Sequence, residues 1–165
     1  MIIKKIKKFL KKNFKYFRYK KSFSSKIKRK VSIGINSRIG PYVMIDGENG
    51  SVSIGQNCSV NSFCWIGSGN SNISIGNDVR IGSGSVISCS NHIFENRFKP
   101  IRTQGIKYDQ NIVIGDDVWI GANVTILPNV IIGKGSVIGG GSVVTKNIEE
   151  FTVVAGNPAT KIKER

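Results

Sequence analysis

The chain has 165 residues and a formal net charge of +15, with 25 Lys and Arg against 10 Asp and Glu. Residues 1–30 hold 14 of the basic residues and no acid, so 11 basic residues face 10 acidic ones in the remainder. Nucleic-acid binding would therefore rest on the N-terminal segment alone, and we expect no nucleic-acid partner. A single histidine and three cysteines without short ligand spacing argue against a metal site or a disulfide framework, and a reducing cytoplasm is the simplest compartment.

Residues 1–30 form the first segment. On a helical wheel of about 100° per residue, residues 2–18 place their large apolar side chains within an arc of roughly 140° and every lysine outside it. We predict a basic amphipathic helix, too short and too charged to span a bilayer. It could lie peripherally on the anionic inner face of the cell membrane, or its apolar stripe could pack on the body or on a neighbouring subunit. Residues 19–30 are predicted to form a charged tether.

Residues 31–150 carry a six-residue repeat, in which an aliphatic anchor recurs every sixth position and is often followed by Gly. A period of six does not fit a surface helix and is the signature of a parallel β-helix. Each hexad should form one flat side, with its anchor pointing inward. Three sides to a coil predict an all-β prism of about five triangular coils. The anchors are Ile33, Ile39, Ile45, Ile54, Val60, Ile66, Ile75, Ile81, Ile87, Ile114, Ile120, Ile126, Ile132, Ile138 and Val144.

The repeat is interrupted three times, after Ile45, Ile66 and Ile87. Each interruption follows the third hexad of a coil, so all three insertions should leave the prism at the same corner. The longest insertion, residues 88–111, contains His92, the one histidine of the chain. Long loops on a rigid scaffold commonly carry function, so His92 is a candidate catalytic residue.

The three cysteines and the C-terminal segment are the remaining features of the sequence. Cys58 and Cys64 fall in inward small-residue positions of neighbouring hexads, where a free thiol acts as a small hydrophobe. We expect Cys89 to be a buried filler as well, rather than a nucleophile. Residues 151–165 form a C-terminal extension with a turn at Gly156-Asn157-Pro158, and residues 159–165 are predicted to form a short helix.

The sequence resembles the hexapeptide-repeat acyltransferases, in particular the galactoside, maltose, serine and polysaccharide O-acetyltransferase group. The resemblance spans about residues 31–163. It is most specific in IGDDVWIGANVTILPNVIIGKGSVIGGGSVVTKN (114–147), followed by VVAGNPATKI (153–162). It implies a left-handed parallel β-helix, a homotrimer, and acetyl-CoA as acyl donor in the groove between adjacent subunits, with no metal.

The resemblance also implies roles for individual residues. His92 matches the family's general base, and the backbone N–H of Ala122 matches the donor that faces the thioester. Acetyl-CoA contacts are implied for Trp119, Gly140, Thr145, Lys146 and Lys163. The loop lacks the Asp that often precedes the histidine, because Cys89, Ser90 and Asn91 stand there. The group that orients His92 therefore stays open among Asn91, Glu95, Arg97 and a backbone carbonyl, and the same three side chains are candidates for acceptor contacts.

Three functions are compatible with these residues. The first is an acetyl-CoA-dependent O-acetyltransferase acting on a sugar hydroxyl, in surface polysaccharide (O-antigen or capsule) biosynthesis, by direct attack with His92 as base. The second is an N-acetyltransferase of an amino sugar nucleotide, with the same base and donor. The third is a non-catalytic β-helix scaffold, which has no need of a histidine loop. Carbonic anhydrases of this fold bind zinc through several histidines, so the single histidine excludes that activity.

Overall fold

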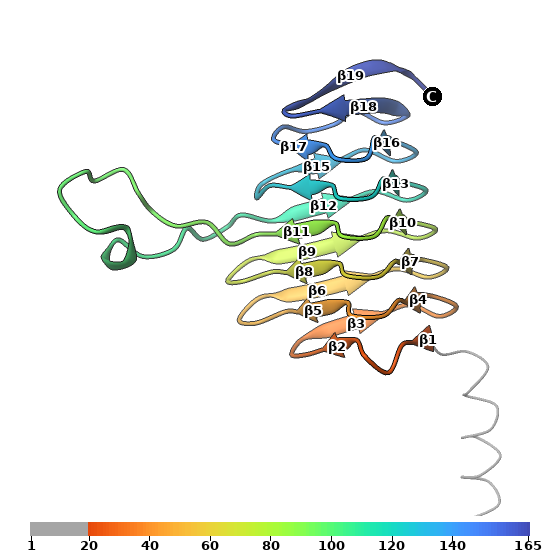
Figure 1. The fold of residues 1–165 in the computed structure, drawn as a ribbon, viewed down its shortest axis with the longest axis horizontal. Helices are drawn as coiled ribbons and strands as arrows, with labels where there is room; N and C mark the ends of the chain where they lie inside the picture. Colours follow the sequence, from red (N-terminus) through yellow and green to blue (C-terminus); the bar gives the residue numbers. More distant parts are fainter. Residues whose placement is uncertain (1–19) are drawn as a thin grey trace, which may run out of the picture.

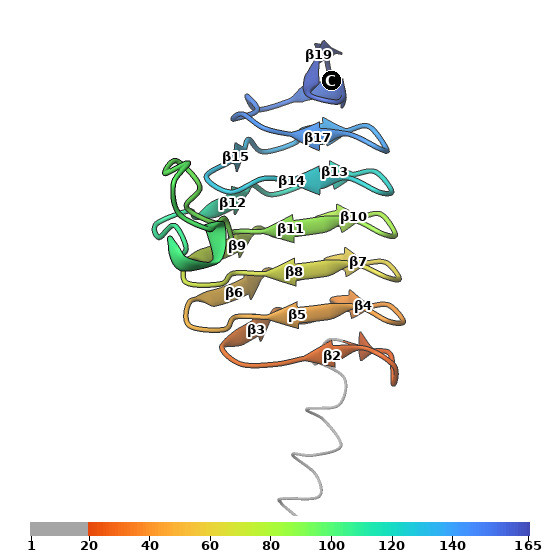
Figure 2. The same cartoon turned by 60° about the vertical axis from the view of Figure 1, so that its left-hand side comes forward.

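The computed structural model describes residues 20–165, and the predicted amphipathic helix at 2–18 lies outside the described residues. The described chain winds into a parallel β-helix whose short strands stack coil on coil along one axis (Figure 1). Turning the molecule shows successive faces of the same prism, with one long loop standing away from it (Figure 2). The all-β class and the parallel β-helix predicted from the hexads are confirmed.

Three sheets form the sides of the prism. Sheet A contains β1 (Lys20–Lys21), β4 (Arg38–Ile39), β7 (Ser59–Val60), β10 (Arg80–Ile81), β13 (Trp119–Ile120), β16 (Val137–Ile138), β18 (Thr152–Gly156) and β19 (Ala159–Glu164). Sheet B contains β2 (Lys26–Ile27), β5 (Met44–Asp46), β8 (Trp65–Gly67), β11 (Val86–Ser88), β14 (Thr125–Ile126) and β17 (Val143–Val144). Sheet C contains β3 (Val31–Ile33), β6 (Ser51–Ile54), β9 (Asn72–Ile75), β12 (Ile112–Ile114) and β15 (Ile131–Ile132).

The fifteen anchors fall into three stacked columns, one on each sheet, in the register that the repeat predicts. In sheet C, for example, Ile33 pairs with Ile54, Ile54 with Ile75, and Ile75 with Ile114. All but one of the anchors are buried, and the exception, Ile33, lies partly buried in the first coil. The core is thus a narrow apolar column. The thiols of Cys58, Cys64 and Cys89 are buried in it, as predicted for the first two and for the third as a filler.

The three insertions leave the prism at one corner, as predicted. They connect β5 to β6, β8 to β9 and β11 to β12, which in each case is the passage from sheet B to sheet C. Backbone bonds stack the insertions on one another, since the Asn49 N–H donates to the Gly69 carbonyl and the Cys89 N–H to the Gly67 carbonyl. The corner between sheets B and C, the BC corner, is therefore the place where side chains can be added without disturbing the core.

The prism begins earlier than the repeat suggests. Residues 20–30, expected to form a tether, contribute β1 and β2, which pair in parallel with β4 and β5. Lys21 stands beside Ile39 in this ladder, in a position where every later coil has an aliphatic residue. Parallel pairing uses backbone groups, so an edge strand can join the sheet without an apolar anchor. Six coils result, rather than about five.

The helix predicted at 159–165 is wrong, because that segment forms β19. Strand β19 pairs antiparallel with β18 across the Gly156-Asn157-Pro158 turn. Thr152 and Val154 are buried and alternate with less buried neighbours, which is the two-residue period of a strand. Strand β18 pairs with the last coil strand of sheet A, β16, so the hairpin covers backbone groups that would otherwise lack partners.

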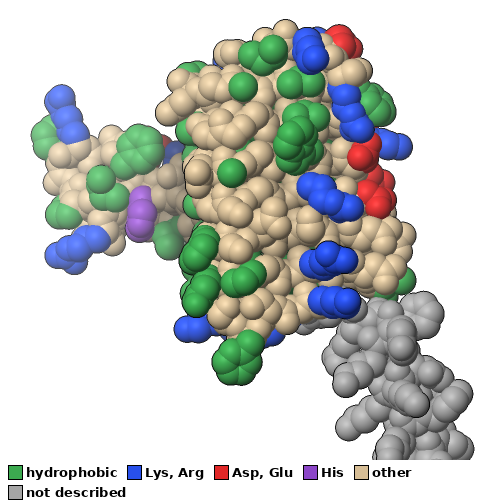
Figure 3. All heavy atoms as spheres, turned by 45° about the vertical axis from the view of Figure 1, so that its right-hand side comes forward, with side chains coloured by type: hydrophobic (Ala, Val, Ile, Leu, Met, Phe, Trp, Pro, Cys, Tyr) green, Lys and Arg blue, Asp and Glu red, His purple; other side chains and the backbone are tan. Residues whose placement is uncertain are grey.

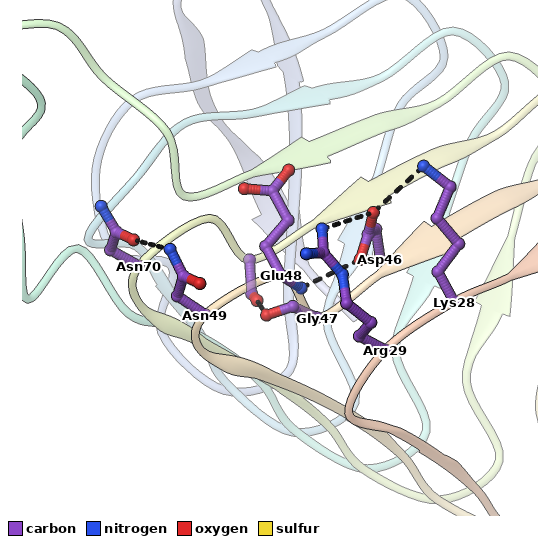
Figure 4. Close-up of polar contacts among 8 residues, drawn as sticks. Lys28, Arg29, Asp46, Gly47, Glu48, Asn49 and Asn70 are labelled. Carbon is purple, nitrogen blue, oxygen red and sulfur yellow. Dashed lines mark hydrogen bonds and ion pairs between the residues drawn. The ribbon is translucent and has the colours of Figure 1, made fainter.

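A buried carboxylate ties the first coil to the second (Figure 4). Asp46, at the end of β5, is 2% exposed, and its carboxylate accepts a hydrogen bond of 2.9 Å from the Glu48 N–H. Lys28 and Arg29, from the coil below, lie 3.2 and 3.6 Å from the same carboxylate. The Glu48 N–H, followed by these two cations, holds the pKa of Asp46 below its ordinary value although burial opposes this.

Replacing Asp46 by Ala should therefore destabilise the protein by about 1–3 kcal/mol, because the Glu48 N–H loses its acceptor. The contribution requires the ionised carboxylate. Because the pKa of Asp46 is lower in the folded state, its stabilising contribution is complete at a pH above the ordinary Asp pKa. The contribution is lost as the pH falls through the pKa of Asp46 in the folded protein. Urea titrations at neutral pH and below pH 4 measure it. Glu149→Ala, at an exposed acid, is the matched control, and an equal loss in both variants would contradict the anchoring role.

Candidate active site

The predicted site residues fall into two groups on the prism. Trp119 and Lys163 lie on sheet A, and Ala122 and Gly140 lie in turns that lead from sheet A to sheet B, the AB corner. The second group lies at the BC corner, on the other edge of sheet B. It consists of Asn91, His92, Glu95 and Arg97 in the long loop, and Thr145 and Lys146 after β17.

Ala122 and Gly140 stand one above the other at the AB corner. The Ala122 carbonyl accepts a hydrogen bond of 2.8 Å from the Gly141 N–H. A Cβ atom on Gly140 would lie 3.2 Å from that carbonyl oxygen, so a larger residue would crowd the corner. Within residues 20–165 the N–H groups of Ala122 and Gly140 donate no hydrogen bond. Two fixed, unpaired donors at one exposed corner can bind a carbonyl oxygen or an oxyanion.

Buried serines hold both turns in place. Ser85, inside the coil below Ala122, donates to the Gly121 carbonyl at 3.0 Å and accepts from the Val124 N–H at 3.2 Å. It thereby fixes the residues on both sides of the Ala122 turn. Ser142 acts similarly one coil higher, donating to the Gly139 carbonyl at 2.6 Å and accepting from the Gly156 N–H at 3.1 Å.

Trp119 stands on the outer face of sheet A and is 58% exposed. Arg80 is its neighbour in β10, and Arg38 lies two strands beyond Arg80 in the same register. In the other direction the ladder continues through Val137 and Val153 to Lys163. The outer face of sheet A therefore combines an exposed aromatic ring with cations on both sides of it, an arrangement suited to a ligand with an aromatic base and phosphates.

The long loop is built around its own hydrogen bonds. Its two arms pair through a bridge between His92 and Ile106, and its tip is closed by the Gln104 side chain, which donates to the carbonyls of Asn96 and Lys99 at 2.8 Å. The loop stands away from the prism (Figures 1 and 2). Large apolar side chains are exposed along it, although they cover no part of the described body. They are Phe94, Phe98, Ile101, Ile106 and Tyr108.

His92 is exposed on the outgoing arm of the loop. The Asn91 carbonyl accepts from the Lys107 N–H at 2.9 Å, which keeps the arms in register beside the imidazole. Glu95 is engaged elsewhere, since its carboxylate accepts from Lys107 at 2.7 Å and from the Phe94 N–H at 3.0 Å. The hydrogen bond from Lys107 is the main reason that the pKa of Glu95 lies below its ordinary value. Arg97 stacks on Phe98, with its guanidinium carbon 4.8 Å from the ring centroid.

Thr145 and Lys146 are exposed two coils above the loop at the BC corner. Lys146 also lines a pocket beneath the terminal hairpin, together with Asn147, Thr152, Ala159 and Lys161. Cys89, at the base of the loop, is no nucleophile, because burial raises the pKa of its thiol to about 12. Within residues 20–165, no three His, Cys, Asp or Glu side chains gather into a group that could hold a metal ion. The same residues form no helix with the length and apolar character needed to cross a bilayer.

Residues 111–146, which carry the AB-corner donors, match the family model described as bacterial transferase hexapeptide, six repeats. These residues are transferase-type hexapeptide repeats. No curated protein matches the sequence.

Several solved structures resemble the hexapeptide-repeat body. A variant of AntD, an N-acyltransferase from Bacillus cereus in complex with dTDP and coenzyme A, is 24% identical, with a TM-score of 0.75 over 93% of this chain and 87% of that one. An acetyltransferase from Vibrio cholerae O1 biovar eltor, complexed with acetyl coenzyme A, is 27% identical, with a TM-score of 0.56 over 91% and 72%. Galactoside acetyltransferase in complex with coenzyme A is 29% identical, with a TM-score of 0.56 over 88% and 64%.

Sequence reasoning missed three residues of this site. Arg38 and Arg80 directly precede the anchors Ile39 and Ile81, as Trp119 precedes Ile120. Because the repeat puts these positions on one face, their alignment with Trp119 could have been recognised from the phase alone. Ser85 occupies an inward position that is Val43, Cys64 and Val124 in three other coils, and only the structure shows which turn it holds.

Replacing Ser85 by Ala should lower the free energy of unfolding by about 1–3 kcal/mol, because the buried Val124 N–H loses its acceptor. The turn that presents the Ala122 N–H should loosen with it. Ser83→Ala is the matched control, since Ser83 is exposed two residues earlier in the same coil. Urea denaturation of both variants measures the difference, and a fully stable Ser85→Ala protein would show that the turn needs no such support.

Proposed function

We propose that this chain is an acyltransferase that moves an acetyl group from acetyl-CoA to a sugar acceptor. The observation that carries the proposal is the pair of unpaired N–H donors at Ala122 and Gly140, three and twenty-one residues after the exposed Trp119. They lie in the segment that matches the transferase hexapeptide model. The coenzyme A complexes of two acetyltransferases, 27% and 29% identical to this chain, support the choice of donor.

The chemistry assigns one task to each group. Acetyl-CoA supplies an activated thioester carbonyl when it is bound. His92 accepts the proton of the acceptor hydroxyl as that oxygen attacks the carbonyl, and it returns the proton to the departing thiolate. The Ala122 N–H donates to the oxygen that becomes negative, and the rigid turn holds this donor in place beforehand. The products are an acetyl ester and coenzyme A, and no acyl-enzyme forms.

The position of His92 requires a second copy of the chain. Ala122 and the loop that carries His92 lie at opposite edges of sheet B, so one copy does not bring them together. The exposed apolar side chains of the loop suit a contact with a neighbouring prism. We therefore propose a homotrimer in which His92 of one copy meets the AB corner of the next.

The donor-binding residues divide in the same way. Trp119, Gly140 and Lys163 line sheet A and the AB corner of one copy, whereas Thr145 and Lys146 lie at the BC corner. A coenzyme A molecule between two copies would meet the first set from one copy and the second set from its neighbour. Asn91, which precedes His92 in the chain, and Arg97, in the same loop, are the candidates for contacting the acceptor or orienting the imidazole. Glu95 would act by pairing with Lys107.

A sugar hydroxyl is the first candidate acceptor, in a surface polysaccharide or its precursor. The likeness to galactoside acetyltransferase supports it. The likeness to AntD, an N-acyltransferase that also has a structure in complex with dTDP-4-amino-4,6-dideoxyglucose, favours an amino sugar nucleotide as the second candidate. An acetyl-CoA turnover screen over sugars and amino sugars distinguishes an ester product from an amide. Absence of turnover on every acceptor would favour the scaffold alternative.

We also propose a peripheral location at the cytoplasmic face of the cell membrane, through residues 1–18. The supporting observation is the sequence of that segment, which on a helical wheel places the apolar side chains on one face and the lysines outside it. An acceptor that is linked to lipid would be presented at such a surface. Binding of the full chain to anionic vesicles, compared with a chain whose tail lysines are replaced by glutamine, tests this location.

Replacing His92 by Ala should reduce turnover about 10²–10⁴-fold, the usual contribution of a general base. Stability should change little, because His92 is an exposed loop residue. The Michaelis constant for acetyl-CoA should change far less than turnover.

Lys146→Ala is the contrasting variant. Loss of a uniform contact to the donor should raise the Michaelis constant for acetyl-CoA more than it lowers turnover. Steady-state kinetics of both variants beside the wild type separate the two roles. Near-normal turnover of His92→Ala would remove the catalytic assignment.

A further inference from the structure

We propose that the first coil of the prism is itself a membrane-contacting surface, which docks on anionic lipid headgroups through cations and an exposed aromatic edge. This contact is made by residues of the folded body. It is separate from the tail at 1–18 and independent of the chemistry at the AB corner. It would set the direction of the prism axis relative to the membrane.

The charge on the body is polarised along the prism axis. Residues 20–45 contain seven Lys and Arg and no Asp or Glu, whereas residues 146–165, at the other end, contain four basic and three acidic residues. The first acid after Lys20 is Asp46, which is buried and already paired with Lys28 and Arg29. Figure 3 shows Asp and Glu only in the upper half of the visible face, while Lys and Arg continue to its lower end.

An aromatic edge runs beside these cations. Phe23 lies in the turn between β1 and β2 and is fully exposed, at 102%. Tyr42 and Phe63 occupy the same AB corner in the next two coils, exposed by 62% and 65%, and their rings stack with centroids 5.2 Å apart. Three exposed aromatic side chains therefore follow one edge of the prism up from its first coil.

The backbone at this edge favours small residues, not aromatic ones. Tyr42 and Phe63 have positive φ angles of 56° and 64°. Gly84, Asn123 and Gly141 occupy the equivalent turn position in the later coils, also with positive φ. Bulky side chains in the left-handed region are unfavourable by roughly 1–2 kcal/mol each. Because these rings also cover no core, their benefit must come from something outside the described chain.

An anionic lipid surface fits both features. Each Lys or Arg near such a surface contributes about 1 kcal/mol, and aromatic side chains insert at the boundary between headgroups and acyl chains. Strands β1, β2 and β3 end their sheets, so the first coil is the last layer of the described body. A fluid bilayer adapts to a projecting aromatic tip, and the cations of the same coil complement its anionic headgroups.

Tryptophan placed at the edge reports the contact directly. In the full chain, Phe23→Trp emission should shift to the blue on vesicles of phosphatidylcholine and phosphatidylserine and should be quenched by brominated lipids. Phe98→Trp, at a position in the long loop that is 83% exposed, is the matched control and should be unaffected by vesicles. The wild-type signal of Trp65 and Trp119 is subtracted. No quenching of Phe23→Trp would overturn the proposal. So would a blue-shifted emission without vesicles, since it would mean that residues 1–19 or a second copy cover Phe23.

The cations are tested in the same vesicles. The double variant Lys20→Gln/Lys26→Gln should weaken partitioning by about thirtyfold, from roughly 1 kcal/mol per lysine. The matched control Lys99→Gln/Lys134→Gln, which removes the same charge from the loop and from a later coil, should change it little. Equal losses in the two pairs would show that only net charge matters, and would overturn the assignment to the first coil.

Discussion

The structure depends on the parallel register that stacks each hexad on the hexad one coil below. This register aligns fifteen aliphatic anchors into three columns and joins neighbouring coils by backbone hydrogen bonds. Each coil buries its anchors only against the coils above and below, so the prism is stable as a stack and not coil by coil. The residues at the corners can vary, because the anchor columns and the strand ladders lie on the sides of the prism.

The candidate site depends on this difference between the sides of the prism, which hold the fold together, and its corners, which can vary. At the AB corner the ladder leaves the N–H groups of Ala122 and Gly140 without a partner among the described residues, and both residues are small and exposed. At the BC corner the same scaffold accepts a long insertion that carries His92. The two corners lie on opposite edges of sheet B, so the proposed chemistry needs adjacent copies to bring base and donors together.

Much of the fold could be predicted from the sequence, because the period and phase of the anchors determine sheet, register and corner together. The first coil was not predicted, because Lys21 occupies the position where the other coils have an aliphatic anchor. Strand β1 joins sheet A through backbone pairing alone. The C-terminal segment was mistaken for a helix because its pairing with β18 is a tertiary contact that local sequence does not reveal.

The site was less predictable than the fold. Its residues could be located by phase and by resemblance, but their partners could not. The pairing of Glu95 with Lys107 and the support of the Ala122 turn by Ser85 join residues 12 and 36–39 positions apart. Such contacts depend on the path of the loop and on the coil spacing, which the hexad pattern does not contain.

A complementation experiment tests most directly whether the site forms between copies. His92→Ala removes the base, and Gly140→Leu places a side chain against the Ala122 carbonyl at the corner. Each variant alone should be inactive. Co-expression should restore roughly a quarter of wild-type activity, because in random closed assemblies about that share of interfaces joins an intact loop to an intact corner. A co-expressed mixture as inactive as the single variants would contradict a site shared between copies.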